Sequence, residues 1–233
     1  MSEWTIAAPE YFERIELGAK EFKRQLQLPD MEAVTEIVPL RSLKTIASPP
    51  IPISHELLAH LIRHIKTLDG RMPFPRAQLQ MVKVDPRQLK IGQRFVYREN
   101  YQRLLEELPD IFHRYAMAGG GLSDLGACFV FGFDEDGKYS LACYLPPLIE
   151  DHGNGDGLVI MDGIHRNFTV RQAGGTINAV ILRQVDLPFP CGPRSWSEIK
   201  VIPLADKPKD VNERYFDLQI GLFRDLKYLG IDG

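Results

Sequence analysis

One segment in the third quarter of the chain restricts the fold more than any other. Residues 158–161 form the short apolar run of a buried strand, and the Asp-Gly pair at 162–163 marks a turn. The same patterning predicts a short helix over about 166–173, a Gly-Gly break at 174–175 and a strand over 178–182. The order strand, turn, helix, strand predicts a sheet with a helix packed on it.

The composition is that of an ordinary globular protein. The chain has 233 residues, of which 44% are hydrophobic and 25% charged, so disorder is not expected. A formal net charge of −3 and a pI near 6.1 give no overall basic field for nucleic acid or for an anionic membrane. Binding to DNA would therefore need a local basic patch.

Cysteine usage and the lengths of the apolar runs indicate the compartment. Cys128, Cys143 and Cys191 form no CxxC pair and do not have zinc-ligand spacing. The first residues lack the basic-then-apolar order of a signal peptide, and no run approaches 18 apolar residues. We therefore expect a protein of the reducing cytoplasm, with neither a disulfide framework nor a membrane contact.

Residues 1–76 are expected to form a mostly helical flank. Apolar residues recur at steps of three and four over 9–26, which predicts one helix. A short strand is expected over 35–40, and the proline-rich run at 47–53 predicts a non-helical linker. A second helix is predicted over 54–70, with a serine N-cap and a glycine at its C-terminal end.

Residues 77–205 are expected to form the central domain. Its first strand, 81–84, ends at an Asp-Pro pair. Two strands, 127–133 and 138–145, flank an Asp-Gly turn and should pair as an antiparallel hairpin. These strands and the 158–182 segment predict an α+β fold, a small mixed sheet with helices packed on it.

Three further elements complete the expected organisation. We expect a helix over about 100–108, a glycine break at 118–121, and a C-terminal helix within 206–233 that packs on the central domain. Asp210 would cap that last helix, with Glu213 at its third position.

The turn at Asp162–Arg166, DGIHR, carries the residues with the clearest chemistry. It lies where a buried strand meets a helix, so backbone N–H groups and the positive end of the helix dipole would favour an anion such as phosphate. Gly163 permits close backbone approach, His165 could exchange a proton with a phosphoryl oxygen, and Arg166 offers a planar fork. Asp162 could hold a metal ion or orient the histidine. The alternative is a tight turn whose polar side chains form surface hydrogen bonds.

This segment, VIMDGIHRNFTVRQAGG, resembles the strand–DGxHR–helix signature of the ParB/sulfiredoxin superfamily, and residues 82–90 are similar to the first strand and loop of that domain. The resemblance spans about 80–185. It implies a sheet of the ParB/sulfiredoxin type and a turn that binds nucleotide phosphates through Gly163, Ile164, His165 and Arg166. Members include CTP-binding chromosome-partition proteins, sulfiredoxins that use ATP, free-serine kinases, and DGQHR-type proteins linked to DNA phosphorothioation.

Three departures narrow the choice within that superfamily. Ile164 stands where sulfiredoxins place a nucleophilic cysteine, which argues against sulfiredoxin chemistry. Gln93 best matches the glutamate implied as the base of the serine kinases, and an amide cannot accept a proton at neutral pH. Partition proteins continue into a helix-turn-helix region, whereas only one helix is expected here after residue 205.

Three more residues are candidates for the same site, each with a plainer alternative. Asp85 could be a base or a magnesium ligand, although an aspartate before proline also simply starts a turn. Glu150 opens a polar, glycine-rich run and could bind a metal ion together with Asp162, or could belong to a solvated connector. Arg183, at a strand end, could add a second positive charge to the site or serve solubility.

The leading hypothesis is a nucleotide-binding enzyme that transfers or hydrolyses a phosphoryl group, with His165, Asp162 and Asp85 as catalytic residues. ATP, ADP or CTP with Mg²⁺ is the expected cofactor, a small hydroxylated metabolite the acceptor, and a homodimer the expected assembly. The alternative is a catalytically inactive or switch-like nucleotide-binding module, which Gln93 favours. A contiguous basic stripe would link that module to DNA, although nucleic acid is the less expected partner.

Overall fold

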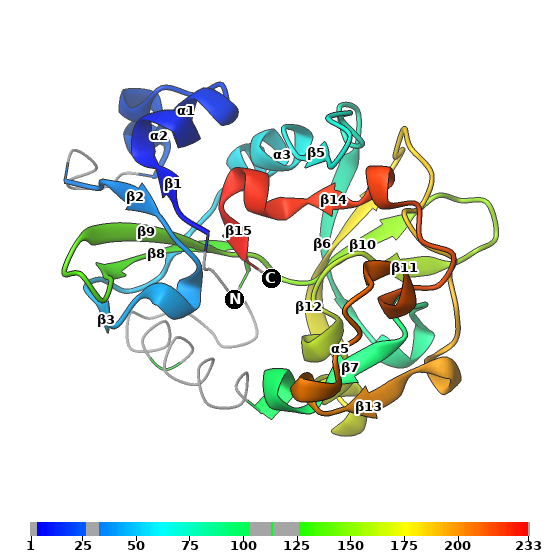
Figure 1. The fold of residues 1–233 in the computed structure, drawn as a ribbon. Helices are drawn as coiled ribbons and strands as arrows, with labels where there is room; N and C mark the ends of the chain where they lie inside the picture. Colours follow the sequence, from blue (N-terminus) through cyan, green and yellow to red (C-terminus); the bar gives the residue numbers. More distant parts are fainter. Residues whose placement is uncertain (1–3, 27–32, 103–112, 114–125, 233) are drawn as a thin grey trace. The chain divides into compact units, whose positions relative to one another are not determined.

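The computed structural model describes residues 4–26, 33–102, 113 and 126–232. It combines α-helices with several small β-sheets (Figure 1), which confirms the α+β class predicted from the sequence. Among the described residues, no helix has both the length and the apolar character needed to cross a membrane.

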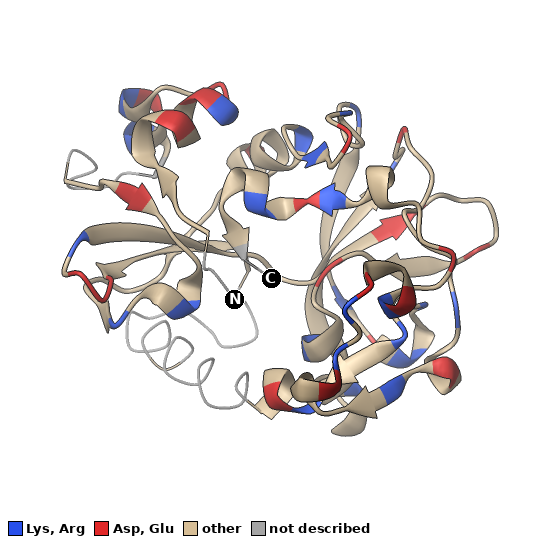
Figure 2. Ribbon diagram, viewed as in Figure 1, with Lys and Arg blue, Asp and Glu red and all other residues tan. Residues whose placement is uncertain are grey.

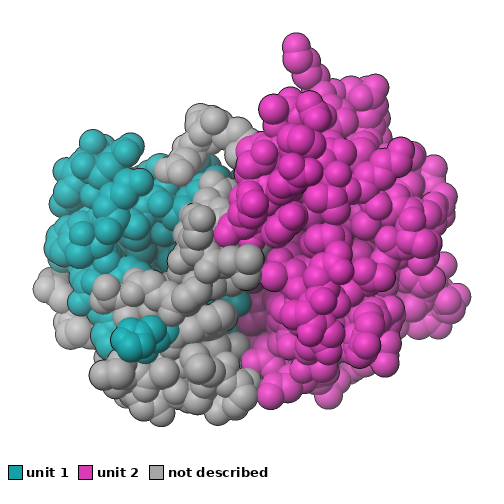
Figure 3. Space-filling model, turned by 90° about the horizontal axis from the view of Figure 1, so that it is seen from below, with its two compact units in different colours: residues 1–65, 111–145, 225–233 teal, residues 66–110, 146–224 magenta. Residues whose placement is uncertain are grey.

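The chain divides into two compact units (Figure 3), and each unit is assembled from separate stretches of sequence. Unit 1 comprises residues 1–65, 111–145 and 225–233, and unit 2 comprises residues 66–110 and 146–224. The sequence predicts boundaries at residues 76 and 205 instead. The division differs because strands from both ends of the chain pair in one sheet of unit 1.

The sheet of unit 1 is built on the predicted hairpin. Strands β8 (Cys128–Phe133) and β9 (Tyr139–Tyr144) pair antiparallel, and Gly137 takes the φ of 75° that their turn requires. The sheet order is β1-β2-β9-β8-β3, with β15 paired to β9 and β4 to β8. The short strands are β1 (Ile6–Ala7), β2 (Glu36–Ile37), β3 (Thr45–Ile46), β4 (Ile51–Pro52) and β15 (Ile231–Asp232).

The N-terminal region is less helical than the sequence predicts. The single helix expected over 9–26 is two helices, α1 (Ala8–Arg14) and α2 (Ala19–Leu26). The chain breaks between them, where Glu16 adopts a φ of 50°. This break lets both helices bury their apolar residues in one core, where the rings of Tyr11 and Phe22 meet edge to face, 6.0 Å apart. The region also contributes strands, so it is not a helical flank.

Helix α3 (His55–Arg63) confirms the predicted start of the second helix but not its end. The hydroxyl of Ser54 caps the helix by accepting from the Leu57 N–H at 3.2 Å. The helix ends before β5 (Lys66–Thr67), and the Leu68 N–H donates to the Phe223 carbonyl instead of continuing the helix. Leu68 is consequently exposed, although the helical spacing predicts it to be buried.

Unit 2 contains the four-stranded sheet that positions the DGIHR turn. Its order is β11-β10-β12-β6, with β10 parallel to β12 and the other neighbours antiparallel. The strands are β6 (Gln78–Val84), β10 (Leu148–Asp151), β11 (Leu158–Ile160) and β12 (Ile177–Arg183). The sequence analysis did not predict β10, which lies between two prolines and the polar loop.

Helix α5 (Ile164–Gln172) covers one face of this sheet. Ile164 and Phe168 of the helix pack in one apolar cluster with Ile149, Ala179 and Ile181 of the strands. Because side chains alternate along a strand, the residues between these face the other way. Glu150 is one of them, so its side chain lies on the sheet face opposite α5.

The C-terminal helix predicted within 206–233 does not form. Asp210 caps a short 3₁₀ turn, and the segment after it pairs with other parts of unit 2 through single backbone bonds, such as Phe216 N–H to Gly92 O. Gly221 and a positive φ at Asp217 oppose a continuous helix. The region contains β14 (Arg224–Asp225) and the 3₁₀ turns η5 (Leu204–Asp206), η6 (Val211–Arg214), η7 (Ile220–Leu222) and η8 (Leu226–Leu229).

Two small pairings and two further turns complete the described chain. Strand β7 (Phe95–Tyr97) pairs parallel with β13 (Lys200–Ile202), and β14 pairs with β5. The remaining 3₁₀ turns are η1 (Leu40–Ser42), η2 (Pro86–Gln88) and η4 (Trp196–Glu198). Residues 98–102 are helical, as expected near residue 100; the rest of that predicted helix and the glycine break at 118–121 lie outside the described residues.

Candidate functional site

The DGIHR turn places Gly163 as the N-cap of α5. Gly163 has φ 82° and ψ 29°, a left-handed conformation that glycine adopts without steric cost. A Cβ added there would lie 2.9 Å from Arg166 Nη2 and 3.0 Å from carbon atoms of Pro147. Backbone conformation and close packing thus both require glycine at this position.

The start of α5 is not capped by any side chain that the structure describes. The first intrahelical bond runs from the Asn167 N–H to the Gly163 carbonyl, at 3.0 Å. An α-helix leaves the N–H groups of its first turn without intrahelical acceptors, and the helix dipole makes this end positive. The turn is therefore an electropositive backbone end of the kind that binds anions.

The sequence predicts that Arg166 binds phosphate, but its side chain is buried behind the turn. Its side chain is 4% exposed, and Nη2 donates to Asp162 Oδ2 at 3.0 Å. The guanidinium packs against the Gly163 backbone, as the contact at the missing Cβ shows. Arg166 and Asp162 thus brace the turn from inside and hold Gly163 in its left-handed conformation.

Asn167 is a fully buried polar residue beside the same turn. Its Nδ2 donates to the Gly163 carbonyl at 3.0 Å. Its Oδ1 is buried and has no hydrogen-bond partner among the described residues, and such an atom is normally satisfied by a water or a ligand. The sequence analysis missed Asn167, although a polar residue three positions after the buried Ile164 on one helix face was the available signal.

His165 is fixed in orientation and in tautomer. The Tyr97 backbone N–H donates to Nε2 at 3.1 Å, and the two rings stack with centroids 5.8 Å apart. A nitrogen that accepts this bond carries no proton, so the neutral ring has its proton on Nδ1. This contact holds the His165 ring in place at the turn, whereas the sequence predicts a group that exchanges a proton with a phosphoryl oxygen.

Asp85 lies at the same end of the sheet, but Arg87 occupies its carboxylate. Asp85 caps η2 by accepting from the Arg87 N–H at 2.9 Å, and its oxygens also accept from Arg87 Nε and Nη2. These hydrogen bonds lower the pKa of Asp85 below its usual value. The geometry supports the interpretation of Asp85 as a turn starter and not as a general base.

Arg183 lies at the opposite end of the sheet from the turn. It pairs in register with Asp151, and its Nε donates to Asp151 Oδ2 at 3.0 Å. The turn instead adjoins the start of β10, where the Met161 and Asp162 N–H groups donate to the Leu148 carbonyl. Of the two roles that the sequence left open for Arg183, this position excludes a second positive charge at the turn.

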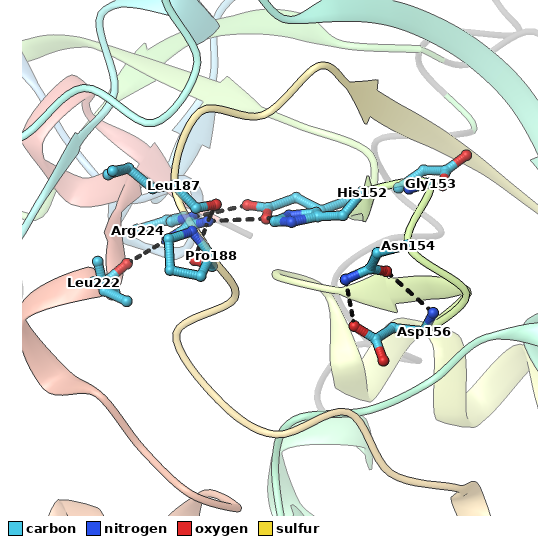
Figure 4. Close-up of polar contacts among 10 residues, drawn as sticks. His152, Gly153, Asn154, Asp156, Leu187, Pro188, Leu222 and Arg224 are labelled. Atoms are coloured by element: carbon cyan, nitrogen blue, oxygen red, sulfur yellow. Dashed lines mark hydrogen bonds and ion pairs between the residues drawn. The ribbon is translucent and has the colours of Figure 1, made fainter.

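Glu150 forms a closed ionic network on the sheet face away from α5. Figure 4 shows Arg224 and His152, the two labelled side chains of this network. Glu150 is fully buried, accepts from Arg224 Nε and Nη2 at 2.8 and 2.9 Å, and meets His152 Nε2 at 2.8 Å. Arg224 also donates to the backbone carbonyls of Leu222 and Pro188. Both Glu150 oxygens are engaged, so the structure does not bring Glu150 to Asp162 as a joint magnesium ligand.

The described residues contain no cluster of three or more His, Cys, Asp or Glu side chains that could hold a metal ion. Near the turn, Asp162 and Asp85 are each paired with an arginine. Magnesium accepts one or two carboxylates when substrate phosphates supply its other ligands. The oxygen ligands at this turn would thus suit a magnesium ion that is already bound to substrate phosphates. They are too few for a metal site made of protein ligands alone.

No protein-family model matches this chain, and the comparisons with curated proteins and with solved structures also gave no match.

Proposed function

We propose that the DGIHR turn binds the phosphate groups of a nucleoside di- or triphosphate, in a domain of the ParB/sulfiredoxin type. One observation carries the proposal: α5 begins at a left-handed glycine, with no described side chain capping its first turn. The phosphate would lie against the N–H groups of this turn, where the helix dipole favours negative charge. The buried, unsatisfied Asn167 Oδ1 supports a ligand or water at the same place.

Each residue of the turn has a distinct role in this proposal. Gly163 lets the phosphate approach the backbone, and Arg166 with Asp162 keeps the turn rigid. His165 would contact a phosphoryl oxygen in the ring orientation that the Tyr97 N–H fixes. Mg²⁺ bound to the phosphates would neutralise part of their charge.

The geometry favours a nucleotide-binding switch over phosphoryl transfer to a hydroxylated metabolite. A general base must reach the hydroxyl proton with a free lone pair. Asp85 and Asp162 accept hydrogen bonds from arginines, and Gln93 Nε2 donates to the Tyr215 hydroxyl at 3.3 Å. These pairings support the switch-like alternative.

Charge distribution does not favour the DNA-associated version of that switch. In the segment beside β7 and β13, basic residues alternate closely with acidic ones, and Figure 2 shows both colours side by side there. The neighbouring pairs are Glu198 and Lys200, Asp206 and Lys207, Lys209 and Asp210, and Glu213 and Arg214. A contiguous basic stripe would have supported contacts with a nucleic-acid backbone.

Titration calorimetry with ATP, ADP, CTP and GTP, with and without Mg²⁺, tests nucleotide binding directly. At least one nucleotide should bind, and at 100 times its Kd it should stabilise the fold by about 2.7 kcal/mol. His165→Glu should weaken binding at least tenfold, because a carboxylate at the helix start repels phosphate. His165→Gln, which still accepts from the Tyr97 N–H, should lose only a few-fold.

Arg183→Gln is the matched control, because it lowers the net charge by one, as His165→Glu does, at the far end of the same sheet. It should leave affinity unchanged within twofold. Absence of binding by every nucleotide, or equal affinity in wild type and His165→Glu, would contradict the proposal. Phosphorus NMR of a long incubation separates the two modes: an unchanged nucleotide supports the switch, and a new phosphoester or released phosphate supports catalysis.

A further inference from the structure

Lys207 is a cation that lies over the ring of Tyr97, the residue that also contacts His165 of the DGIHR turn. Its Nζ lies 5.3 Å from the centre of the Tyr97 ring. The same ring stacks on His165, whose position Tyr97 also fixes through its backbone N–H. One aromatic side chain thus contacts both the histidine of the turn and a lysine more than 40 residues later in the chain.

Several backbone features hold Lys207 in this position. Strands β7 and β13 run parallel, with Tyr97 in register with Ile202, so the chain leaves both strands at the same end. Turn η5 follows, and the Leu204 N–H donates to Glu99 Oε2 at 2.6 Å, close to Tyr97 in sequence. The Lys207 N–H then closes the turn on the Leu204 carbonyl.

Arg214 holds the chain on the other side of Lys207. Its Nε donates to the Pro208 carbonyl and its Nη2 to the Lys209 carbonyl, both at 2.8 Å. Proline on either side of the η5–Lys207 segment, at 203 and 208, further limits its backbone freedom. These contacts fix the backbone from which the Lys207 side chain extends over Tyr97.

We infer that Lys207 is the second cation of the phosphate site, and that it makes the site selective for ligands with at least two linked phosphates. This inference rests on the proposed function of the turn. The first phosphate would occupy the start of α5, and the next would extend past His165 and the Tyr97 edge toward Lys207. In this arrangement the lysine would discriminate between ligands with one and with two phosphates, because its charge would act on the second phosphate.

The structural alternative is that Lys207 only packs on Tyr97, since a lysine over an aromatic ring stabilises a surface modestly by itself. The two interpretations differ in what Lys207 does to ligand selectivity. A packing role changes stability without changing the ratio of affinities for one and two phosphates. A binding role changes that ratio and leaves stability nearly unchanged.

The test is titration calorimetry of the full chain with inorganic phosphate and inorganic pyrophosphate, at low salt because exposed charges are screened. Wild type should bind pyrophosphate more tightly than phosphate. Lys207→Gln should weaken pyrophosphate binding about tenfold and phosphate binding less than threefold. Lys207→Arg, which keeps the charge, should retain most of the selectivity, and Lys207→Met, which keeps the apolar stem over Tyr97, should behave like Lys207→Gln.

Lys209→Gln is the matched control, because it removes the same charge two residues away on an exposed side chain, and it should keep the wild-type ratio. An unchanged ratio in Lys207→Gln, with pyrophosphate still bound, would overturn the role of Lys207 and leave the proposed function standing. Wild type that binds neither anion nor any nucleotide would overturn both.

Discussion

Two arginine–carboxylate pairs lie beside the four-stranded sheet of unit 2, and their surroundings differ. Glu150 and Arg224 are buried, and the guanidinium donates to the carboxylate and to backbone carbonyls around it. Arg166 and Asp162 brace a helix start that no described side chain caps. The first pair satisfies its polar groups within the protein, whereas the second supports backbone donors that a ligand can use. Among the described residues, the buried network leaves no donor for a ligand, whereas the pair at the turn leaves the backbone N–H groups of α5 available.

The largest effect is expected from breaking the closed network. Arg224→Met leaves the Glu150 carboxylate buried without its partner and should lower the free energy of unfolding by about 3–5 kcal/mol. Urea denaturation measures this change. Arg183→Met removes an exposed pair with Asp151 on the same sheet and should cost about 1 kcal/mol or less. Equal losses of unfolding free energy in Arg224→Met and Arg183→Met would contradict the claim that burial makes the Glu150–Arg224 pair costly to break.

A second variant of the network sharpens this point. Combining Arg224→Met with Glu150→Leu removes both charges, so the double variant should be more stable than Arg224→Met alone. A double variant as unstable as the sum of the two single variants would show that packing, and not the ion pair, explains the loss.

The next effect concerns the glycine of the turn. Gly163→Ala introduces both a left-handed alanine and a Cβ about 3 Å from Arg166 and Pro147, and should cost about 2–3 kcal/mol. Gly155→Ala is the control, because Gly155 has a φ of 90° but open space around its Cβ position, and it should cost about 1 kcal/mol. Similar losses in urea denaturation would mean that close packing at the turn contributes nothing.

A smaller effect is expected at alkaline pH beside the closed network. Burial, and then the charge of Glu150, raises the pKa of Cys191 to about 12. The stability from this thiol is present in full below its unfolded pKa near 9 and is lost as the pH rises toward 12. Between pH 9 and 11, wild type should lose about 1 kcal/mol per pH unit more than Cys191→Ala. Parallel stability curves for the two proteins would refute the burial of Cys191.

The smallest effect is expected at Asp85. Asp85→Asn keeps the cap on the Arg87 N–H and should leave nucleotide affinity unchanged within twofold, because the carboxylate already serves Arg87. Loss of nucleotide binding in calorimetry would show that the Asp85 carboxylate contributes to the binding site. The lowered pKa of Asp85 also predicts that its contribution to stability is present above its unfolded pKa and is lost as the pH falls through the folded pKa.

Local patterns predicted the elements whose stability is local. The Asp-Gly hairpin of β8 and β9, the Ser54 cap of α3 and the strand–turn–helix around Gly163 all follow from adjacent residues. The C-terminal helix failed because Gly221 and the positive φ at Asp217 interrupt it, so leucines at helical spacing lie in separate short turns. Of these leucines, Leu222 and Leu229 are buried. Pairing of β15 with β9 joins distant segments, and no local pattern encodes it.

The position of the turn was predicted from the sequence, but the contacts of its side chains were not. The DGIHR motif located the turn, yet the sequence could not show that Arg166 folds behind Gly163 or that Tyr97 fixes the His165 tautomer. Both facts depend on tertiary contacts. The placement of Glu150 on the opposite sheet face followed from β10, a strand too short to be recognised between its neighbours.

Backbone amide chemical shifts test the proposed phosphate site most directly. In a ¹⁵N-labelled sample titrated with pyrophosphate, the amide signals of Ile164, His165 and Arg166 should shift and saturate together. Those of Glu150 and His152 in the closed network should stay unchanged. Shifts confined to residues outside the turn would contradict the assignment of the turn as a phosphate site. So would the absence of any shift up to about 10 mM pyrophosphate, a concentration on the order of a hundred times a sub-millimolar Kd.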